Sequence, residues 1–331
     1  MATDQALATI LSCATPFRLP LNTDFRGVSS REGLLLGGPS GWGEFAPFLE
    51  YDDHTCARWL ASAVEAAFGK WPEPVRDAVP TNAIVPAVGV QAATELTTRA
   101  YERDGCTTVK VKVAQTGQSL DDDLARVEAV RSALRGAGVA AGHIRVDANA
   151  AWTVEQAVIA LAELDAVAGG LQYAEQPCAT LAELADVRRR TAVAIAADES
   201  IRTADDPVVA AASGAVDIVI VKVPPLGGVA AGLAVAQAAG VPVVVSSAMD
   251  SSVGLAAGVA MAAALPDLPY ACGLGTSALW ADDVVRPSLM PIAGVLPVGR
   301  PTVDAEALAR AAGRMDPDRA AWWQARLGRA W

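Results

Sequence analysis

The chain has 331 residues, of which 52% are hydrophobic and 19% charged, so it can build a sizeable core and is neither disordered nor fibrous. Its formal net charge is −11, from 26 basic and 37 acidic residues, and such a charge repels the phosphate backbone of nucleic acids. We therefore expect no nucleic-acid partner. A small anionic substrate remains compatible with this charge if cations are concentrated at one site.

The cysteine and histidine content excludes several kinds of site. Five widely spaced cysteines without a C-x-x-C pair argue against a disulfide framework or a zinc site and favour a reducing compartment. With only His54 and His143 present, most histidine-dependent mechanisms have no support. The N-terminus lacks the basic start of a signal peptide, and the apolar stretch 229–245 is interrupted by glycine, glutamine and proline. We expect a cytoplasmic protein without a membrane span, and the sequence does not reveal its oligomeric state.

The first part of the chain, residues 1–83, has its own pattern. Strands are predicted at Phe17–Leu21 and Glu32–Leu36, a further strand or turn at 41–44, and an amphipathic helix at Asp53–Phe68. Strands followed by a helix indicate a small α+β domain.

A different rhythm begins near Ile84, where short β-branched runs alternate with segments of helical length. The predicted strands are 84–90, 108–113, 144–147, 172–175, 194–198, 217–223, 241–246 and 270–273. The predicted helices are 91–103, 119–135, 154–167, 181–190, 205–213 and 229–239. Strands joined by helix-length linkers must pair in parallel. A doubly wound sheet would have the same rhythm, but eight units over about 200 residues fit a closed (β/α) barrel better.

The barrel is expected to span residues 84–286. The tail, 287–331, has two short predicted helices at Ala305–Ala312 and Asp318–Leu327, and we expect it to return to the N-terminal domain.

Polar residues interrupt the apolar strands near their carboxyl ends. In a barrel these ends carry the catalytic residues, whereas packing alone would place Val, Ile or Leu there. Read in chain order, the residues are Lys110, Lys112, Asp147, Asn149, Glu175, Asp198, Glu199 and Lys222.

Asp147, Glu175 and Asp198 lie on three consecutive strands and would repel one another unless a cation held them together. One such acid could simply cap a helix or pair with an arginine, but three in a row are typical of a metal site. Ligation by oxygen alone, without histidine or cysteine, favours Mg²⁺, with Mn²⁺ second.

The two lysines in the run 109–113 alternate with valines. Because strand side chains alternate between faces, Lys110 and Lys112 are predicted to face the barrel interior and the valines the helices. Lys222, on a later strand, is expected across the barrel from them. Clustered buried lysines should have lowered pKa values, which would make a neutral lysine available as a base. The plainer alternative is that the lysines only pair with the acids.

The ordered set K-x-K, D-x-N, E-Q-P, D-E-S and a single lysine resembles the muconate-lactonizing branch of the enolase superfamily. In this sequence the set begins at Lys110, Asp147, Glu175, Asp198 and Lys222. Within that branch the chain is most similar to the o-succinylbenzoate synthase family, through segments at 25–33, 41–47, 246–254 and 273–276. The resemblance implies a (β/α) TIM-like barrel with an N-terminal α+β capping domain completed by the C-terminal segment.

The resemblance also implies an activity: Mg²⁺-dependent dehydration of 2-succinyl-6-hydroxy-2,4-cyclohexadiene-1-carboxylate to o-succinylbenzoate in menaquinone biosynthesis, through an enediolate. Lys112 would remove the proton and Lys110 would lower the pKa of Lys112. Lys222 would remain cationic and stabilise the intermediate, while Asn149 and Glu199 would orient the metal ligands.

Further substrate contacts are expected from Ser246, Ser247, Gly273 and Gly275 at the last strand ends; the alternative interpretation is that these are ordinary loop residues. Arg26 and Arg31 are assigned to a cap loop over the site, with solvated surface as the alternative for each.

Three rival functions remain open. An N-acylamino acid racemase or dipeptide epimerase would use Lys112 and Lys222 as two bases, and muconate cycloisomerisation is a weaker possibility in the same fold. A non-catalytic binding barrel would not need the complete set of charged residues.

Overall fold

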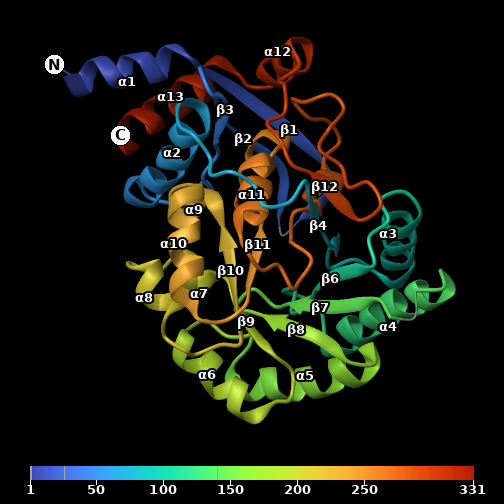
Figure 1. Ribbon diagram of the computed structural model, residues 1–331. Coiled ribbons are helices and arrows are strands. Elements are labelled where there is room, and N and C mark those ends of the chain that lie inside the picture. Colours follow the sequence, from blue (N-terminus) through green and yellow to red (C-terminus); the bar gives the residue numbers. More distant parts are fainter. Residues whose placement is uncertain (1, 26, 140) are drawn as a thin grey trace.

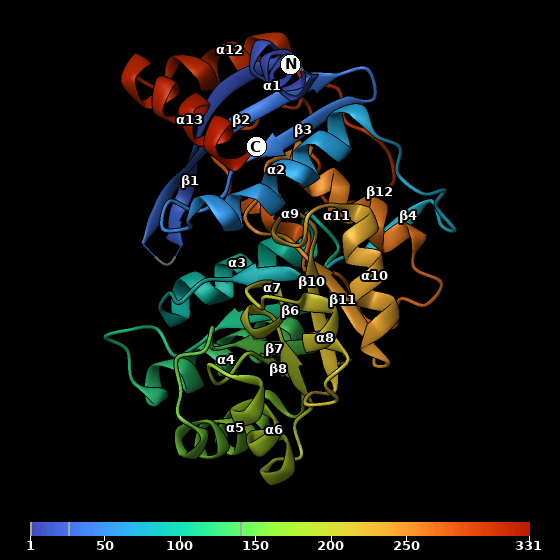
Figure 2. The same cartoon turned by 90° about the vertical axis from the view of Figure 1, so that its left-hand side faces the viewer.

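The computed structural model describes residues 2–25, 27–139 and 141–331. Figures 1 and 2 show two bodies: a capping domain that holds both chain termini, and a curled sheet of parallel strands with helices outside it. Among the described residues, no helix has both the length and the apolar character needed to cross a bilayer.

The capping domain is built on an antiparallel sheet of β1 (Ala14–Phe25), β2 (Val28–Gly38) and β3 (Gly41–Phe45). Leu34 and Leu36 of β2 pack in the cluster that contains the helix α2, while Leu35 packs with Phe17 in another cluster. Successive side chains of a strand point to opposite faces, so the run of leucines shows that both faces of β2 are covered. The predicted strands are confirmed, although each is longer than expected.

Helix α2 (Asp53–Phe68) has the predicted bounds. Asp52 starts it, because its carboxylate accepts a hydrogen bond from Thr55 N at 2.8 Å. The helix lies close against β3: a Cβ at Gly43 would sit 1.9 Å from Ala63 O, so only glycine permits this approach.

The C-terminal segment completes the capping domain, as predicted. Helix α13 (Pro317–Ala330) buries Trp323 in the cluster that also contains Phe45 and Trp59, and α12 (Ala305–Gly313) packs on β1. The two helices lie beside the N-terminal strands in both views (Figures 1 and 2). Helix α1 (Ala2–Ser12), which contacts α13, was not predicted.

The barrel sheet has the strand order β11-β10-β9-β8-β7-β6-β5, with every neighbouring pair parallel. Its strands are β5 (Ala83–Val85), β6 (Thr108–Lys112), β7 (His143–Asp147), β8 (Leu171–Glu175), β9 (Ile195–Ala197), β10 (Ile218–Lys222) and β11 (Val243–Ser246). The predicted eighth strand is reduced to two isolated bridges, Cys272 to Thr81 and Gly273 to Ser246, which join the two edges of the sheet. The barrel predicted from the sequence is confirmed.

The helices of the barrel are α3 (Val90–Glu102), α4 (Leu120–Gly136), α5 (Val154–Ala168), α6 (Leu181–Arg190), α7 (Glu199–Arg202), α8 (Pro207–Ala211), α9 (Val223–Leu226), α10 (Val229–Ala239) and α11 (Ser252–Ala264). A short 3-10 helix, η1 (Gly275–Leu279), follows the closing bridges. An antiparallel two-stranded sheet of β4 (Ala78–Pro80) and β12 (Val295–Pro297) links the tail to the start of the barrel.

Two differences from the prediction have clear causes. Strand β5 ends at Val85 rather than Val90 because Pro86 cannot donate to the sheet ladder. Helix α11 was missed because nearly all of its residues are buried, so the segment has no polar face and no helical period to detect.

The alternation predicted for β6 is confirmed. Val109, Val111 and Val113 pack in the main core cluster with residues of the surrounding helices, while Lys110 and Lys112 are buried on the interior face. The alternation of side chains along β6 therefore places two lysine side chains inside the barrel.

Candidate active site

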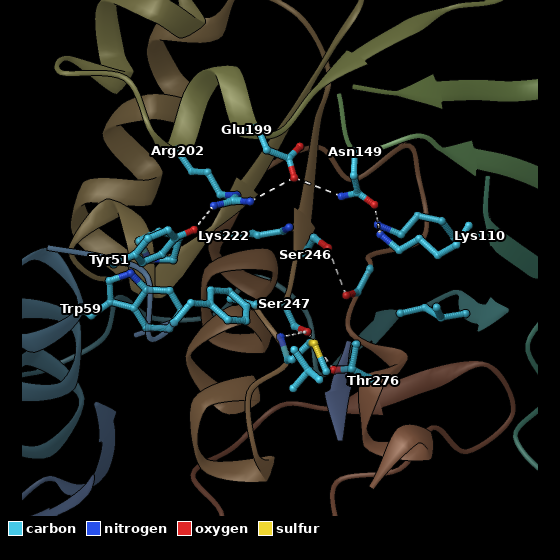
Figure 3. A pocket seen from close by; sticks show the side chains of 18 of the residues that line it. Tyr51, Trp59, Lys110, Asn149, Glu199, Arg202, Lys222, Ser246, Ser247 and Thr276 are labelled. Carbon is cyan, nitrogen blue, oxygen red and sulfur yellow. Dashed lines mark hydrogen bonds and ion pairs between the residues drawn. The ribbon is translucent and has the colours of Figure 1, made fainter. Parts of the chain in front are cut away.

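A cavity of about 330 Å³ lies between the capping domain and the carboxyl ends of the barrel strands. Figure 3 shows the side chains that converge on it. The barrel contributes Lys110, Lys112, Asn149, Glu199, Arg202, Lys222, Ser246, Ser247 and Gly273, and the cap contributes Phe48, Tyr51 and Trp59. A volume of this size is at the lower end of small-molecule sites.

The three predicted carboxylates come together under this cavity. Strand register places Lys112 beside Asp147 and Asp147 beside Glu175, so these groups lie at one level across three neighbouring strands. Asp198 directly follows β9, the next strand. Each of the three carboxylates is at most 1% exposed. The side chains of these acids therefore lie in a region from which water is largely excluded.

Each of these carboxylates is paired with a lysine. Lys112 Nζ lies 2.5 Å from Asp147 Oδ2, Lys222 Nζ lies 2.5 Å from Asp198 Oδ2, and Lys110 Nζ lies 2.9 Å from Glu175 Oε1. Lys110 also contacts Asp147 at 3.2 Å. The alternating charges offset the cost of burying each group alone.

Among the described residues, no three His, Cys, Asp or Glu side chains are grouped so that they could hold a metal ion as they stand. The chemistry of the donor set nevertheless fits a hard divalent cation, because it consists of buried carboxylate oxygens that repel one another. Burial, together with the charge of Asp147, raises the pKa of Glu175 to about 7. A bound cation would relieve this repulsion by taking over carboxylate contacts now made by lysines.

The lysines differ in their electrostatic environment. Burial lowers the pKa of Lys112, and the neighbouring charge of Lys110 lowers it further, against the opposing effect of Asp147. Burial also acts to lower the pKa of Lys110, but Glu175 and Asp147 outweigh it, so that pKa is raised. The predicted lowering is right in direction for Lys112 and wrong for Lys110, because Lys110 has two carboxylate partners.

Unlike the pKa of Glu175, the pKa values of Asp147 and Asp198 are lowered by their contacts with cations. Burial acts to raise the pKa of Asp147, but Lys112 and Lys110 hold it below its usual range. The pKa of Asp198 is also lowered, since Lys222 and Arg202 outweigh the effect of burial. These two groups are therefore ionised and available as oxygen ligands at neutral pH.

Asn149 and Glu199 form a bridge between the ends of β7 and β9. Asn149 Oδ1 accepts a hydrogen bond from Lys112 Nζ at 2.8 Å, and Asn149 Nδ2 donates to Glu199 Oε1 at 3.0 Å. Asn149 has a φ of +46°, a backbone conformation that asparagine tolerates better than most residues. The amide thus holds the ammonium of Lys112 in place.

The predicted substrate contacts are brought together only in part. Ser246, Ser247 and Gly273 line the cavity, and Ser247 Oγ lies 2.8 Å from Thr276 Oγ1. Gly275 is outside the described lining; a Cβ there would lie 2.3 Å from Asn82 O, so its role is close packing. Arg26 lies outside the described residues.

Arg31 is not a solvated loop residue, as one alternative had it. It lies in β2 with 5% exposure, stacks over the Phe48 ring at 4.1 Å, and donates to Ala46 O and Met249 O. It therefore ties the cap to the loop after β11.

Several residues of the site were missed from the sequence. Arg202 follows Asp198 by four residues, a spacing at which side chains on one helical turn meet, so this signal was available. Phe48, Tyr51 and Trp59 come from the cap and carry no local signal, because only the packing of α2 on the barrel brings them to the cavity.

Comparison with known proteins decides the family. Residues 92–302 match the enolase C-terminal domain-like family model and residues 17–67 the enolase N-terminal domain-like model. An o-succinylbenzoate synthase from Thermobifida fusca is 55% identical over 314 residues, covering 95% of this chain and 94% of that protein. One from Mycobacterium leprae is 50% identical over 305 residues, covering 92% and 87%. The chain belongs to the o-succinylbenzoate synthase family of the enolase superfamily.

Solved structures of lower identity support the fold. Muconate lactonizing enzyme from Pseudomonas fluorescens, in complex with muconolactone, has a TM-score of 0.76 at 20% identity, covering 90% of this chain and 97% of that one. The L-Ala-D/L-Glu epimerase from Bacillus subtilis has a TM-score of 0.72 at 21% identity, covering 88% and 96%. These two enzymes carry out different reactions, so their likeness to this chain concerns the fold alone. Enzymes of the superfamily generally use a divalent metal.

Proposed function

We propose that this protein dehydrates 2-succinyl-6-hydroxy-2,4-cyclohexadiene-1-carboxylate to o-succinylbenzoate, a step of menaquinone biosynthesis, with Lys112 as the base. The observation that carries the proposal is the position of Lys112, whose buried Nζ lies at the cavity wall beside Asp147 and Asn149. The family membership of the chain supports the same reaction.

Asp147, Glu175 and Asp198 would hold a magnesium ion. When bound, the ion supplies positive charge that stabilises the enediolate form of the substrate carboxylate. The donor chemistry of these acids supports Mg²⁺ over softer metals.

Lys112 carries out both proton transfers. In its neutral form it removes the proton α to the substrate carboxylate, and the electrons of the C–H bond pass into the enediolate. The resulting ammonium then donates its proton to the hydroxyl on the same face, so that the C–O bond breaks, water leaves and the ring becomes aromatic. Burial lowers the pKa of Lys112, which favours the neutral form that the first step needs.

Lys222 and Lys110 act through their charge. Lys222 is carried by β10, which is separated from β6 by three strands, so its ammonium faces the substrate from the other side. A fixed cation in a buried site stabilises the negative charge of the enediolate. Lys110, held by Glu175 at 2.9 Å, keeps its proton and disfavours a second charge on Lys112.

Ser246, Ser247 and Gly273, at the last strand ends, would bind the succinyl carboxylate through hydroxyl and backbone groups. They lie on the wall of the cavity that adjoins Lys222, because β11 pairs with β10. Phe48 and Trp59 of the cap supply apolar surface for the carbon skeleton.

The test is a dehydration assay that follows formation of the aromatic product, on metal-stripped protein with and without added Mg²⁺. We expect turnover only with the metal, and a loss of about 100-fold or more in Lys112→Ala, the usual effect of removing a general base. Racemisation of N-acylamino acids is measured in parallel. Racemisation much faster than dehydration, or unchanged dehydration by Lys112→Ala, would overturn the proposal.

A further inference from the structure

A continuous series of hydrogen bonds leads from the capping domain to the proposed base, and Figure 3 shows its part from Tyr51 through Arg202 and Glu199 to Asn149. Arg202 Nη1 donates to the hydroxyl oxygen of Tyr51, and Arg202 Nη2 donates to Glu199 Oε1 at 3.0 Å. The same Glu199 oxygen accepts from Asn149 Nδ2 at 3.0 Å, and Asn149 Oδ1 accepts from Lys112 Nζ at 2.8 Å. Four contacts therefore connect a tyrosine of the cap with Lys112.

The guanidinium of Arg202 also reaches the proposed metal site. Its Nε lies 3.2 Å from Asp198 Oδ1, while the other oxygen of Asp198 lies 2.5 Å from Lys222 Nζ. A guanidinium has five N–H donors in a fixed plane, so one rigid group can fix several oxygens at once. Arg202 thus sets the orientation of the carboxylate of Asp198 as well as that of Glu199.

If Arg202 acted only within the barrel, its ion pairs with Asp198 and Glu199 would be sufficient, and its bond to Tyr51 would have no role. Arg202 could pair with Asp198 and Glu199 within the single turn of α7, without contacting the cap. Its third bond instead crosses to Tyr51, 151 residues away in the chain. Tyr51 and Arg202 both line the cavity, so this crossing lies at the wall of the site.

The same loop is fixed to the cap at a second point. Arg58 of α2 donates to Ala204 O at 3.1 Å and to Asp205 O at 2.9 Å. The segment after β9 is therefore a place where the capping domain is attached to the barrel, and Arg202 is the member of that attachment that turns inward.

We propose that Arg202 is a positioning residue that couples the position of the capping domain to the orientation of two groups in the barrel. Its contact with the Tyr51 hydroxyl depends on where the cap lies. The two groups are the carboxylate of Asp198 and, through Glu199, the side-chain amide of Asn149 that holds Lys112. The inference rests on the proposed function, because it takes Lys112 as the base and Asp198 as a metal ligand. Without the Tyr51 contact the guanidinium of Arg202 has one fewer fixed partner. The Asp198 carboxylate and the Asn149 amide then lose their alignment with a substrate in the cavity.

The experiment is a double-mutant cycle on the full chain. Tyr51→Phe removes only the hydroxyl, Arg202→Met removes the guanidinium, and Arg202→Lys keeps the charge without the planar fork. Each variant is measured for Mg²⁺ affinity by calorimetry in the absence of substrate, and for kcat and KM of dehydration. Circular dichroism melting identifies variants that fail to fold, and Arg202→Lys then serves in place of Arg202→Met.

We expect Arg202→Met to weaken Mg²⁺ binding and to lower kcat by about 10- to 100-fold each, the usual effect of removing a group that orients metal ligands. Tyr51→Phe should lower kcat by a smaller factor with little change in KM, and Arg202→Lys should recover part of both losses. Because Tyr51 acts through Arg202, the double variant should be no worse than Arg202→Met alone.

Arg58→Met is the matched control, since it removes a cap contact to the same loop outside the series. Its effect should combine additively with that of Arg202→Met. Additive effects of Tyr51→Phe and Arg202→Met, or Mg²⁺ affinity and kcat within twofold of wild type in Arg202→Met, would overturn the inference alone. A wild-type protein that binds Mg²⁺ but does not dehydrate the substrate would overturn the proposed function, while the calorimetric cycle would still decide the coupling.

Discussion

Lys222 Nζ lies 2.5 Å from Asp198 Oδ2, so a lysine proposed to stabilise negative charge contacts a carboxylate proposed to hold the metal. The two residues come from the neighbouring strand ends of β10 and β9. The chain has four lysines, and three of them line the cavity, whereas the fourth, Lys70, is exposed. The lysines of this chain are therefore concentrated at the candidate site.

Replacement of Lys222 by alanine should distinguish its proposed effect on the substrate charge from its ion pair with Asp198. We expect kcat to fall by about 100-fold or more, because a preorganised cation opposite the developing charge is lost. Mg²⁺ affinity, measured by calorimetry, should stay the same or increase, since Asp198 loses a competing cation. Lys70→Ala is the control and should match wild type. Full dehydration activity in Lys222→Ala would refute the assigned role.

Glu175→Gln tests the three-carboxylate metal site through stability. Ligand binding to the folded state alone raises its stability by about 2.7 kcal/mol at 100 times the dissociation constant, so Mg²⁺ should raise the melting temperature of the wild type by several degrees. The variant lacks one charged ligand and should lose most of that increase at the same concentration. Glu163→Gln, at an exposed position of α5, should keep it. An equal increase in all three proteins would rule out Glu175 as a ligand.

Glu44 should make the stability depend on pH. Burial raises its pKa from 4.5 to about 8, and Asp250 adds to the effect, while Ser251 and Arg31 oppose it. The folded state therefore holds this proton more tightly than the unfolded state does. The resulting stability is complete below about pH 4.5 and is lost as the pH rises to about 8.

Unfolding by urea at pH 5 and pH 8.5 measures this effect. Glu44→Gln cannot ionise, so its free energy of unfolding should fall less between the two pH values than that of the wild type. Glu65→Gln is a suitable control, because Glu65 also accepts backbone hydrogen bonds at the start of a barrel helix, from Val229 N at 2.6 Å and Ala230 N at 3.0 Å. The same pH dependence in Glu44→Gln and wild type would show that Glu44 does not titrate in this range.

Trp323 tests whether the C-terminal segment is part of the cap. It is fully buried and meets the ring of Phe45 edge-on at 6.1 Å between centroids. Trp323→Ala should lower the free energy of unfolding by about 3–5 kcal/mol, the usual cost of an aromatic-to-alanine cavity. Trp331→Ala, at a residue that is 44% exposed, should change it by less than about 0.5 kcal/mol. If Trp323→Ala lowered the free energy of unfolding as little as Trp331→Ala does, α13 would contribute little to the stability of the cap.

The sequence was most informative where local geometry alone fixes a residue's position. The period of two along residues 109–113 places Lys110 and Lys112 on one face, opposite the valines that pack against the helices. Asp147 and Glu175 end strands that any parallel sheet would bring to one edge. Helices with a polar face, such as α2 and α6, were predicted to the residue. Helix α11, apolar on all sides, offered no period to detect.

Tertiary structure decided what depends on partners distant in the chain. Lys110 and Lys112 look equivalent in the sequence, but two carboxylates raise the pKa of the first and burial lowers that of the second. The contact of Tyr51 with Arg202 joins the cap to the barrel across 151 residues of the chain. The sequence by itself thus determined the barrel, its charged strand ends and the family. Why the pKa of Lys112 is lowered while that of Lys110 is raised, and how the cap reaches the site, followed only from packing, because burial and long-range contacts are properties of the folded chain.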